Sequence, residues 1–255
     1  MKLLKKIGIV LAHVLVVAGL FVAFGFIRQE RDGAVVKDLD LRVDHEGGSY
    51  FIDREGVLQQ LRRAGFGKLE GMRLDSLNLL AIEKAIAKNP YVATAEAYID
   101  MQGHLSIRVT QRQPVLRFIN RYMESFYVDA EGRTMPASPN YAAPVMVASG
   151  NIGDRPAPGD SLRSEAAKQV FALNEYLRNN ELYNALFVQV YVNAQGELEL
   201  VPRVGNHTVL VGDPSDMDEK MEKLLALYRT ALDKEGWEQY RQINVKFKDQ
   251  VICKR

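Results

Sequence analysis

Hydrophobic residues follow one another over 7–27, and His13 is the only ionisable residue in this run. At about 1.5 Å per residue, a helix of this length crosses the roughly 30 Å hydrocarbon core of a bilayer. Lysines alone supply charge before the run, whereas charges of both signs follow it. Because basic flanks stay in the cytoplasm, the pattern predicts a cytoplasmic stub over 1–6, a membrane anchor over 7–27 and an extracytoplasmic remainder. The residues that we assign to the anchor include Ile7, Val10, Leu15, Leu20, Phe24 and Ile27.

A cleaved signal peptide is the alternative for this segment. The apolar core of a signal peptide normally spans about 7 to 15 residues and ends at a small-x-small site. The run here is longer, and Ala23-Phe24-Gly25 is a poor match to such a site. A lone His13 could serve a proton relay, but without a charged companion we interpret it as a neutral imidazole that faces a partner helix or lies near the inner half of the bilayer.

After a linker over 28–36, the periods of strands and helices predict a small domain over 37–113. We expect a strand over 38–43, a helix from Asp53, a helix over 76–88 capped by Asp75 or Ser76, and a hairpin. The hairpin alternates Ala95, Ala97, Ile99 and Met101 on one face and turns at Gln102-Gly103. This strand-helix-helix-strand-strand order places both helices on one face of a three-stranded sheet.

For the remainder, 114–255, the sequence predicts a larger mixed domain with two helices and a greater number of strands. Gln113-Pro114 closes the first domain, because proline disfavours regular pairing. One helix starts at Ser161 or Ser164, and the other runs from Ser215 to Leu232. The fold class is therefore α+β, with a single N-terminal transmembrane helix. The expected strands are 117–119, 125–128, 144–148, 188–192, 198–200, 208–211 and an alternating segment, 242–253, in which Ile243, Val245 and Phe247 share a face.

Composition narrows the possible functions. A content of 47% hydrophobic and 25% charged residues is ordinary for a folded protein, and a net charge of +1 excludes a strongly basic nucleic-acid surface. The single cysteine, Cys253, cannot form an internal disulfide. It also lacks a neighbouring histidine in the sequence that would activate it as a nucleophile.

Gly159-Asp160-Ser161-Leu162 matches the nucleophile block of a lipase-like hydrolase family. That chemistry needs an Asp-x-x-His pair to take the serine proton, and the chain contains no such pair. We interpret Ser161 as a helix cap. The acidic pairs Glu197/Glu199 and Asp216/Asp218 fit a solvated strand face and a helix N-terminus. No histidine or cysteine pair has metal-ligand spacing, so we expect no catalytic, cofactor or metal site.

Three motifs resemble the FtsQ/DivIB family of bacterial division proteins. Asn89-Pro90-Tyr91-Val92 opens the predicted hairpin, residues 107–115 (Ile-Arg-Val-Thr-Gln-Arg-Gln-Pro-Val) close it, and 126–132 (Phe-Tyr-Val-Asp-Ala-Glu-Gly) begin the second domain. The resemblance lies in their order and spacing over almost the whole chain, and it implies that the first domain is a POTRA domain and the second a β-rich domain. The positions that depart from the family pattern are Gln111, Gln242, Asn244, Lys246 and Phe247.

The resemblance implies a non-enzymatic scaffold of the division septum in the bacterial inner membrane. Its partners would be bitopic coiled-coil proteins of the FtsB and FtsL kind. We expect binding by strand addition to an open sheet edge near the C-terminus, or else a strand that only completes its own sheet. The alternatives are an envelope hydrolase and a polypeptide-transport component, although the chain has no room for a transport barrel. The predicted partner-binding residues are Phe247, Gln250, Val251, Ile252 and Cys253.

Overall fold

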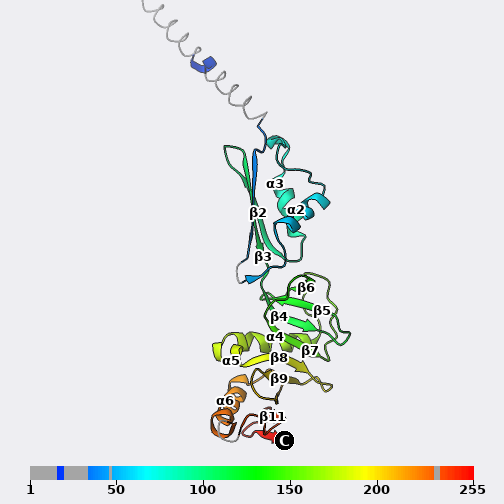
Figure 1. The fold of residues 1–255 in the computed structure, drawn as a ribbon, viewed down its shortest axis with the longest axis vertical. Coiled ribbons are helices and arrows are strands. Elements are labelled where there is room, and N and C mark those ends of the chain that lie inside the picture. Colours follow the sequence, from blue (N-terminus) through cyan, green and yellow to red (C-terminus); the bar gives the residue numbers. More distant parts are fainter. Residues whose placement is uncertain (1–15, 20–33, 46–47, 233–235) are drawn as a thin grey trace, which may run out of the picture. The chain divides into compact units, whose positions relative to one another are not determined.

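The structure is a computed structural model that describes residues 16–19, 34–45, 48–232 and 236–255 (Figure 1). The predicted anchor falls outside these residues except for 16–19, which are helical. Within the described part of the chain, no helix has the length and apolar character needed to cross a membrane. The described chain divides into two units, and the second includes the short segment 48–51 besides 112–255.

The first unit is a three-stranded sheet covered by two helices. Its strands have the order β1-β3-β2, with β1 parallel and β2 antiparallel to the central β3. Both helices lie on one side of the sheet, as the alternation of the sequence predicts (Figure 1). The core joins Val57, Leu61, Ile82 and Ile86 of the helices to alternate residues of β3. The elements are β1 (Asp38–Asp44), α2 (Arg54–Arg63), η2 (Leu74–Ser76), α3 (Leu79–Ala87), β2 (Val92–Ile99) and β3 (His104–Gln111).

Two details of this unit differ from the sequence prediction. The second helix is capped by Asn78, whose side chain accepts a hydrogen bond from Ala81 N at 2.9 Å, while Asp75 and Ser76 belong to the preceding 3-10 turn. Met101 does not continue the face of β2 and is fully exposed. The turn begins earlier because Asp100 accepts hydrogen bonds from the backbone of both Gln102 and His104.

The second unit contains a nine-stranded mixed sheet among its described residues. The strand order is β12-β11-β10-β9-β8-β7-β4-β5-β6, and β4, β7 and β8 are mutually parallel neighbours. The strands are β4 (Pro114–Ile119), β5 (Ser125–Asp129), β6 (Thr134–Pro136), β7 (Met146–Gly150), β8 (Phe187–Val192), β9 (Leu198–Pro202), β10 (Thr208–Gly212), β11 (Gln242–Asn244) and β12 (Ile252–Lys254).

Helices α4 (Glu165–Arg178) and α6 (Met217–Leu227) bury their apolar stripes against this sheet. Val170, Leu173 and Leu177 of α4 are completely buried beside Val190 and other strand residues. Burying such side chains contributes about 1.5 to 3 kcal/mol each, so the packing of the two helices on the sheet stabilises the unit. The remaining helical segments are α5 (Glu181–Leu186) and the π-helical turn η3 (Tyr228–Leu232).

The prediction of two helices for this unit was therefore too low, and it was also wrong at some boundaries. The short α5 follows α4 directly because Asn180 caps it, accepting hydrogen bonds from Leu182 N and Tyr183 N. The last helix changes to a π turn at Tyr228. Pro114 opens a strand rather than only closing the first domain, since the first residue of a strand can lack an N–H.

A buried carboxylate organises the start of the second unit. Asp129 is 2% exposed and ends β5. Its Oδ1 accepts hydrogen bonds from the backbone N–H groups of Glu131 and Arg133, and its Oδ2 pairs with Arg112 at 2.7 Å. Gly132 completes the turn at φ 75°, a conformation that favours glycine. This network gives a physical reason for the aspartate and glycine of the 126–132 motif.

The capping residue of α3 can be tested by substitution. We expect Asn78→Ala to lower the free energy of unfolding by about 1 kcal/mol, because the N–H of Ala81 would lose its acceptor. Ser76→Ala is the matched control, since Ser76 lies in the 3-10 turn and donates to the Arg73 carbonyl instead. Chemical denaturation measures both values, and a larger loss for Ser76→Ala would contradict the assignment.

Candidate partner-binding edge

The two edge strands of the nine-stranded sheet differ in what lies beside them. At one end, a loop covers β6, because Thr134 N donates to Asp160 O at 2.9 Å and Gly159 N donates to Thr134 O at 2.8 Å. At the other end, β12 pairs antiparallel with β11 and has no second strand neighbour in the described part of the chain. An open edge presents backbone N–H and C=O groups to any extended segment that approaches.

The side chains of this edge divide between the two faces of the sheet. Val251 and Cys253 pack against the hydrophobic core, and burial raises the pKa of the Cys253 thiol. Ile252 is 40% exposed, and Gln250 is also exposed. The structure thus brings the predicted residues to one hairpin, where the core itself covers two of them.

Phe247 lies in the turn between β11 and β12 and is 39% exposed. The sequence prediction placed it on one face with Ile243 and Val245, which are completely buried. The chain turns at this point instead of continuing as one strand, and Asp249 adopts φ 60° within the turn. Aspartate tolerates this left-handed conformation better than bulkier residues do.

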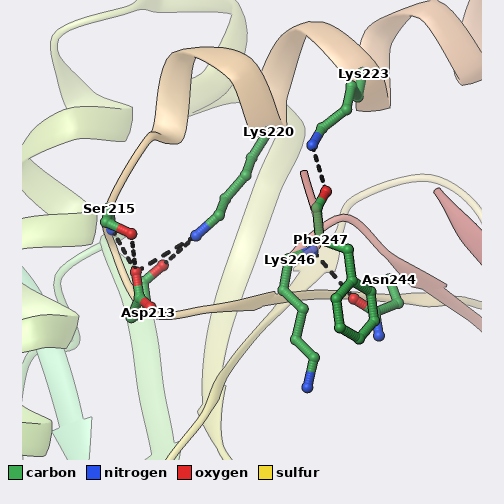
Figure 2. Close-up of polar contacts among 7 residues, drawn as sticks. All are labelled: Asp213, Ser215, Lys220, Lys223, Asn244, Lys246 and Phe247. Carbon is green, nitrogen blue, oxygen red and sulfur yellow. Dashed lines mark hydrogen bonds and ion pairs between the residues drawn. The ribbon is translucent and has the colours of Figure 1, made fainter. Parts of the chain in front are cut away.

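Helix α6 fastens this turn to the rest of the unit (Figure 2). Lys223 Nζ donates to the backbone carbonyl of Phe247 at 2.7 Å and pairs with Glu219 at 3.0 Å. The hydrogen bond from Lys223 lowers the pKa of the Glu219 carboxyl. The Lys223 side chain is only 18% exposed, and its one ammonium group joins α6 to the turn.

A second lysine of α6 holds the loop that enters the helix. Lys220 is 5% exposed, and its Nζ donates to the Asp213 carbonyl at 2.9 Å (Figure 2). Ser215 donates to the Asp213 carboxylate through both its backbone N–H and its hydroxyl, and these bonds lower the pKa of that carboxyl. Ser215, the predicted first residue of this helix, therefore stabilises the loop, while Asp216 occupies the N-cap position at φ 48°.

The strand β11 and its following residues are tied to the β8–β9 hairpin. Lys246 Nζ pairs with Glu197 Oε1 at 2.8 Å, and this bond, together with one from Asn193, lowers the pKa of the Glu197 carboxyl. Asn244 accepts a hydrogen bond from Lys246 N at 3.1 Å, and Lys246 Nζ lies 5.1 Å from the Phe247 ring centroid. These contacts give Asn244, Lys246 and Phe247 a structural role in this chain.

An aromatic cluster lies at the start of β10. His207 is 2% exposed, and its Nε2 lies 2.8 Å from the Tyr228 hydroxyl. The indole of Trp237 stacks on His207 and meets the Tyr228 ring edge to face. Burial lowers the pKa of His207, because the imidazolium form is poorly solvated in this cluster.

The other candidates from the sequence have structural partners. Ser161 bridges to Arg133 beside the covered β6 edge, and Ser164, rather than Ser161, caps α4. Within the described residues, no group of three or more His, Cys, Asp or Glu side chains could hold a metal ion. Asp218 accepts from the Tyr176 hydroxyl at 2.7 Å, while Glu199 faces Asn193 at 3.3 Å.

Sequence reasoning missed the two lysines of α6. Lys220 had a detectable signal, since it falls beside Met217, Met221 and Leu224 on the stripe that the helix buries. A lysine at such a position needs a nearby oxygen acceptor. Lys223 had no such signal, because its acceptor is a backbone carbonyl that only the folded turn supplies.

Comparison with known protein families agrees with the two units. A POTRA-like domain model matches residues 34–110, which defines the class of the first unit. The model "FtsQ/DivIB, C-terminal related" matches residues 113–254, more than half of the chain. The chain therefore belongs to the FtsQ/DivIB family and is a cell-division protein. A comparison with curated proteins finds no match.

The link between α6 and the turn can be tested through Lys223→Met. This change keeps the length of the side chain but removes its ammonium group. We expect amide hydrogen exchange in 252–254 to become about tenfold faster, since a hydrogen bond to a charged donor contributes about 1.5 kcal/mol. Lys168→Met, an exposed lysine of α4, should leave exchange in 252–254 unchanged. Equal exchange in both variants would contradict the role of Lys223.

The aromatic cluster makes stability depend on pH. A histidine whose pKa is lowered by folding binds protons more readily in the unfolded chain. Its contribution is therefore complete above its ordinary pKa of about 6.5 and is lost as the pH falls below that value. We expect the wild type to lose more stability than His207→Gln between about pH 7 and pH 5. Denaturant unfolding at each pH measures the difference, and parallel curves would contradict it.

Proposed function

We propose that this protein is a non-enzymatic, single-pass scaffold that gathers partner division proteins outside the inner membrane. The observation that carries the proposal is the contrast between the two ends of the sheet. The loop 157–161 covers the edge of β6, whereas β12 has β11 as its one strand neighbour in the described chain. A fold that covers one edge and leaves the other is suited to accepting a strand at the second.

Strand addition at β12 would use backbone groups for affinity and flanking side chains for selectivity. Ile252 and Phe247 are the exposed apolar side chains of the hairpin. A partner strand laid along β12 would cover Ile252, and Lys223 would keep the turn at Phe247 in place. A preorganised edge has less conformational entropy to lose when it binds.

The family supports division proteins as partners, and we propose FtsB-like and FtsL-like bitopic proteins with coiled coils. This assignment needs the scaffold and its partners on the same side of one membrane. The lysine-rich stub and the apolar run over 7–27 support that arrangement, with the N-terminus in the cytoplasm and both folded units outside. The anchor would then bring partner segments to the C-terminal edge at high local concentration.

The hydrolase alternative has less support from the structure. Each histidine outside the anchor has a partner other than a serine: His45 contacts Gln111, His104 contacts Asp100, and His207 contacts Tyr228. The Gly-Asp-Ser motif also has a structural use, because Gly159 and Asp160 bond to β6. A polypeptide-transport role has no supporting observation in the second unit.

The proposed edge can be tested by deleting residues 249–255, which removes β12. We expect the shortened chain to lose co-purification of FtsB-like and FtsL-like partners from membranes, because the added strand would lose its template. Circular dichroism and thermal melting establish whether the remainder stays folded. Retained partner binding by the folded, shortened chain would overturn the edge-strand mechanism.

Ile252→Asp provides a smaller change at the same edge. A charge at this position should disfavour a paired apolar strand without removing any backbone group. Leu182→Asp is the matched control, because Leu182 is an apolar side chain that is 51% exposed on α5, a helix outside the sheet. We expect about tenfold weaker partner binding for the first variant and no change for the second.

A further inference from the structure

The second unit contains a cavity of about 620 Å³ that the proposed edge does not use. It lies where β4, β7 and β8 begin, and Val115, Met146 and Phe187 form its apolar wall. These three strands are parallel neighbours, so their amino-terminal ends meet at one side of the sheet. The volume falls within the range of sites for small ligands and short peptide segments.

Two arginines line the cavity, and each is held by contacts of its own. Arg203 N donates to Leu186 O at 2.7 Å, and its Nε donates to Ala185 O at 3.0 Å. Arg178, in the last turn of α4, pairs with Glu175 through one terminal nitrogen. A guanidinium has five N–H donors, so these contacts fix the two groups while further donors remain for a ligand.

A buried amide lies deeper in the same cavity wall. Asn174 is 1% exposed, and its Nδ2 donates to Val115 O at 3.3 Å. Its Oδ1 is buried without a hydrogen-bond partner in the described chain. A buried acceptor that stays unpaired costs about 1 to 3 kcal/mol, so a ligand that donates a hydrogen bond to Asn174 Oδ1 would recover this free energy.

We propose that this cavity binds a carboxylate-bearing peptide segment of a partner protein. The carboxylate would pair with Arg178 and Arg203 at the exposed mouth, where planar guanidinium groups match its two oxygens. A backbone N–H of the segment would donate to Asn174 Oδ1 after a small shift of the amide, and an apolar side chain would pack on Met146 and Phe187. A phosphate group offers neither the N–H nor the apolar side chain, which is why the observations favour a peptide.

The test uses the full chain in detergent micelles and the peptide acetyl-Gly-Leu-Ala with a free terminal carboxylate. Isothermal titration and saturation-transfer NMR measure its binding beside that of the same peptide with a terminal amide. We expect the amide form to bind at least about tenfold more weakly, because it cannot form the charged pair with the arginines. Equal binding of the two forms, or no binding of the acid at millimolar concentration, overturns the proposal.

The variant Arg178→Gln/Arg203→Gln should weaken binding of the acid by about tenfold or more while its melting temperature stays close to that of the wild type. Arg163→Gln is the matched control, since Arg163 is an exposed arginine paired with Asp160 at 2.9 Å. Unchanged affinity in the double variant overturns the proposal. Displacement of the peptide by an equal concentration of inorganic phosphate also overturns the proposal, because it would indicate a general anion site.

The chain without residues 249–255 separates this proposal from strand addition at β12. None of these residues lines the cavity. We expect the shortened chain to bind the peptide with unchanged affinity, even where partner co-purification is lost. Evidence against strand addition at β12 therefore does not contradict peptide binding in the cavity. Evidence against peptide binding in the cavity likewise does not contradict strand addition.

Discussion

The backbone hydrogen bonding of a sheet requires a neighbour for every strand edge, and this requirement shapes the second unit. Seven inner strands satisfy it through strands on both sides, while the two terminal strands do not. The chain covers β6 with the loop that carries Gly159 and Asp160, whereas β12 has β11 as its one strand neighbour in the described chain. The proposed strand addition depends on this difference between the two edges.

The open strand β12 can bind a partner strand well only if it is held in place, and α6 provides that restraint. Its apolar stripe packs on the sheet, while Lys220 and Lys223 reach backbone carbonyls on either side of the helix, one before it and one in the last turn of the chain. Both lysines are largely buried, so their ammonium groups need these oxygens. The Lys220 contact thus holds the loop that enters α6, and the Lys223 contact holds the turn that precedes β12.

The sequence predicted what depends on periodicity and missed what depends on contacts between distant residues. The order of the first unit and the alternating strands of the second follow from local patterns. The cap of α3 was misplaced because Asn78 and Ser76 are both good capping residues, and only the 3-10 turn decides between them. Phe247 was placed on the wrong face because β11 ends at Asn244, and residues 245–251 form the connection back to β12 instead of continuing the strand. The cavity arginines gave no local signal, because Arg178 ends α4 and Arg203 follows β9 far along the sequence. Only the folded unit brings both to one cavity.

The β12 edge offers backbone groups to a partner, whereas the cavity offers charged and polar side chains. This difference affects how selectively each surface would bind. At β12 the backbone supplies the interaction, so many sequences could pair there and selectivity rests on Ile252 and Phe247. In the cavity the guanidinium groups and the Asn174 amide demand a particular chemistry, so selectivity is high although the contact area is small. Since the two surfaces share no residue, binding at one has no direct contact through which to oppose binding at the other. A partner that bound the β12 edge and the cavity at the same time would gain affinity from both contacts together. A membrane-bound assembly would then not need a single extensive interface.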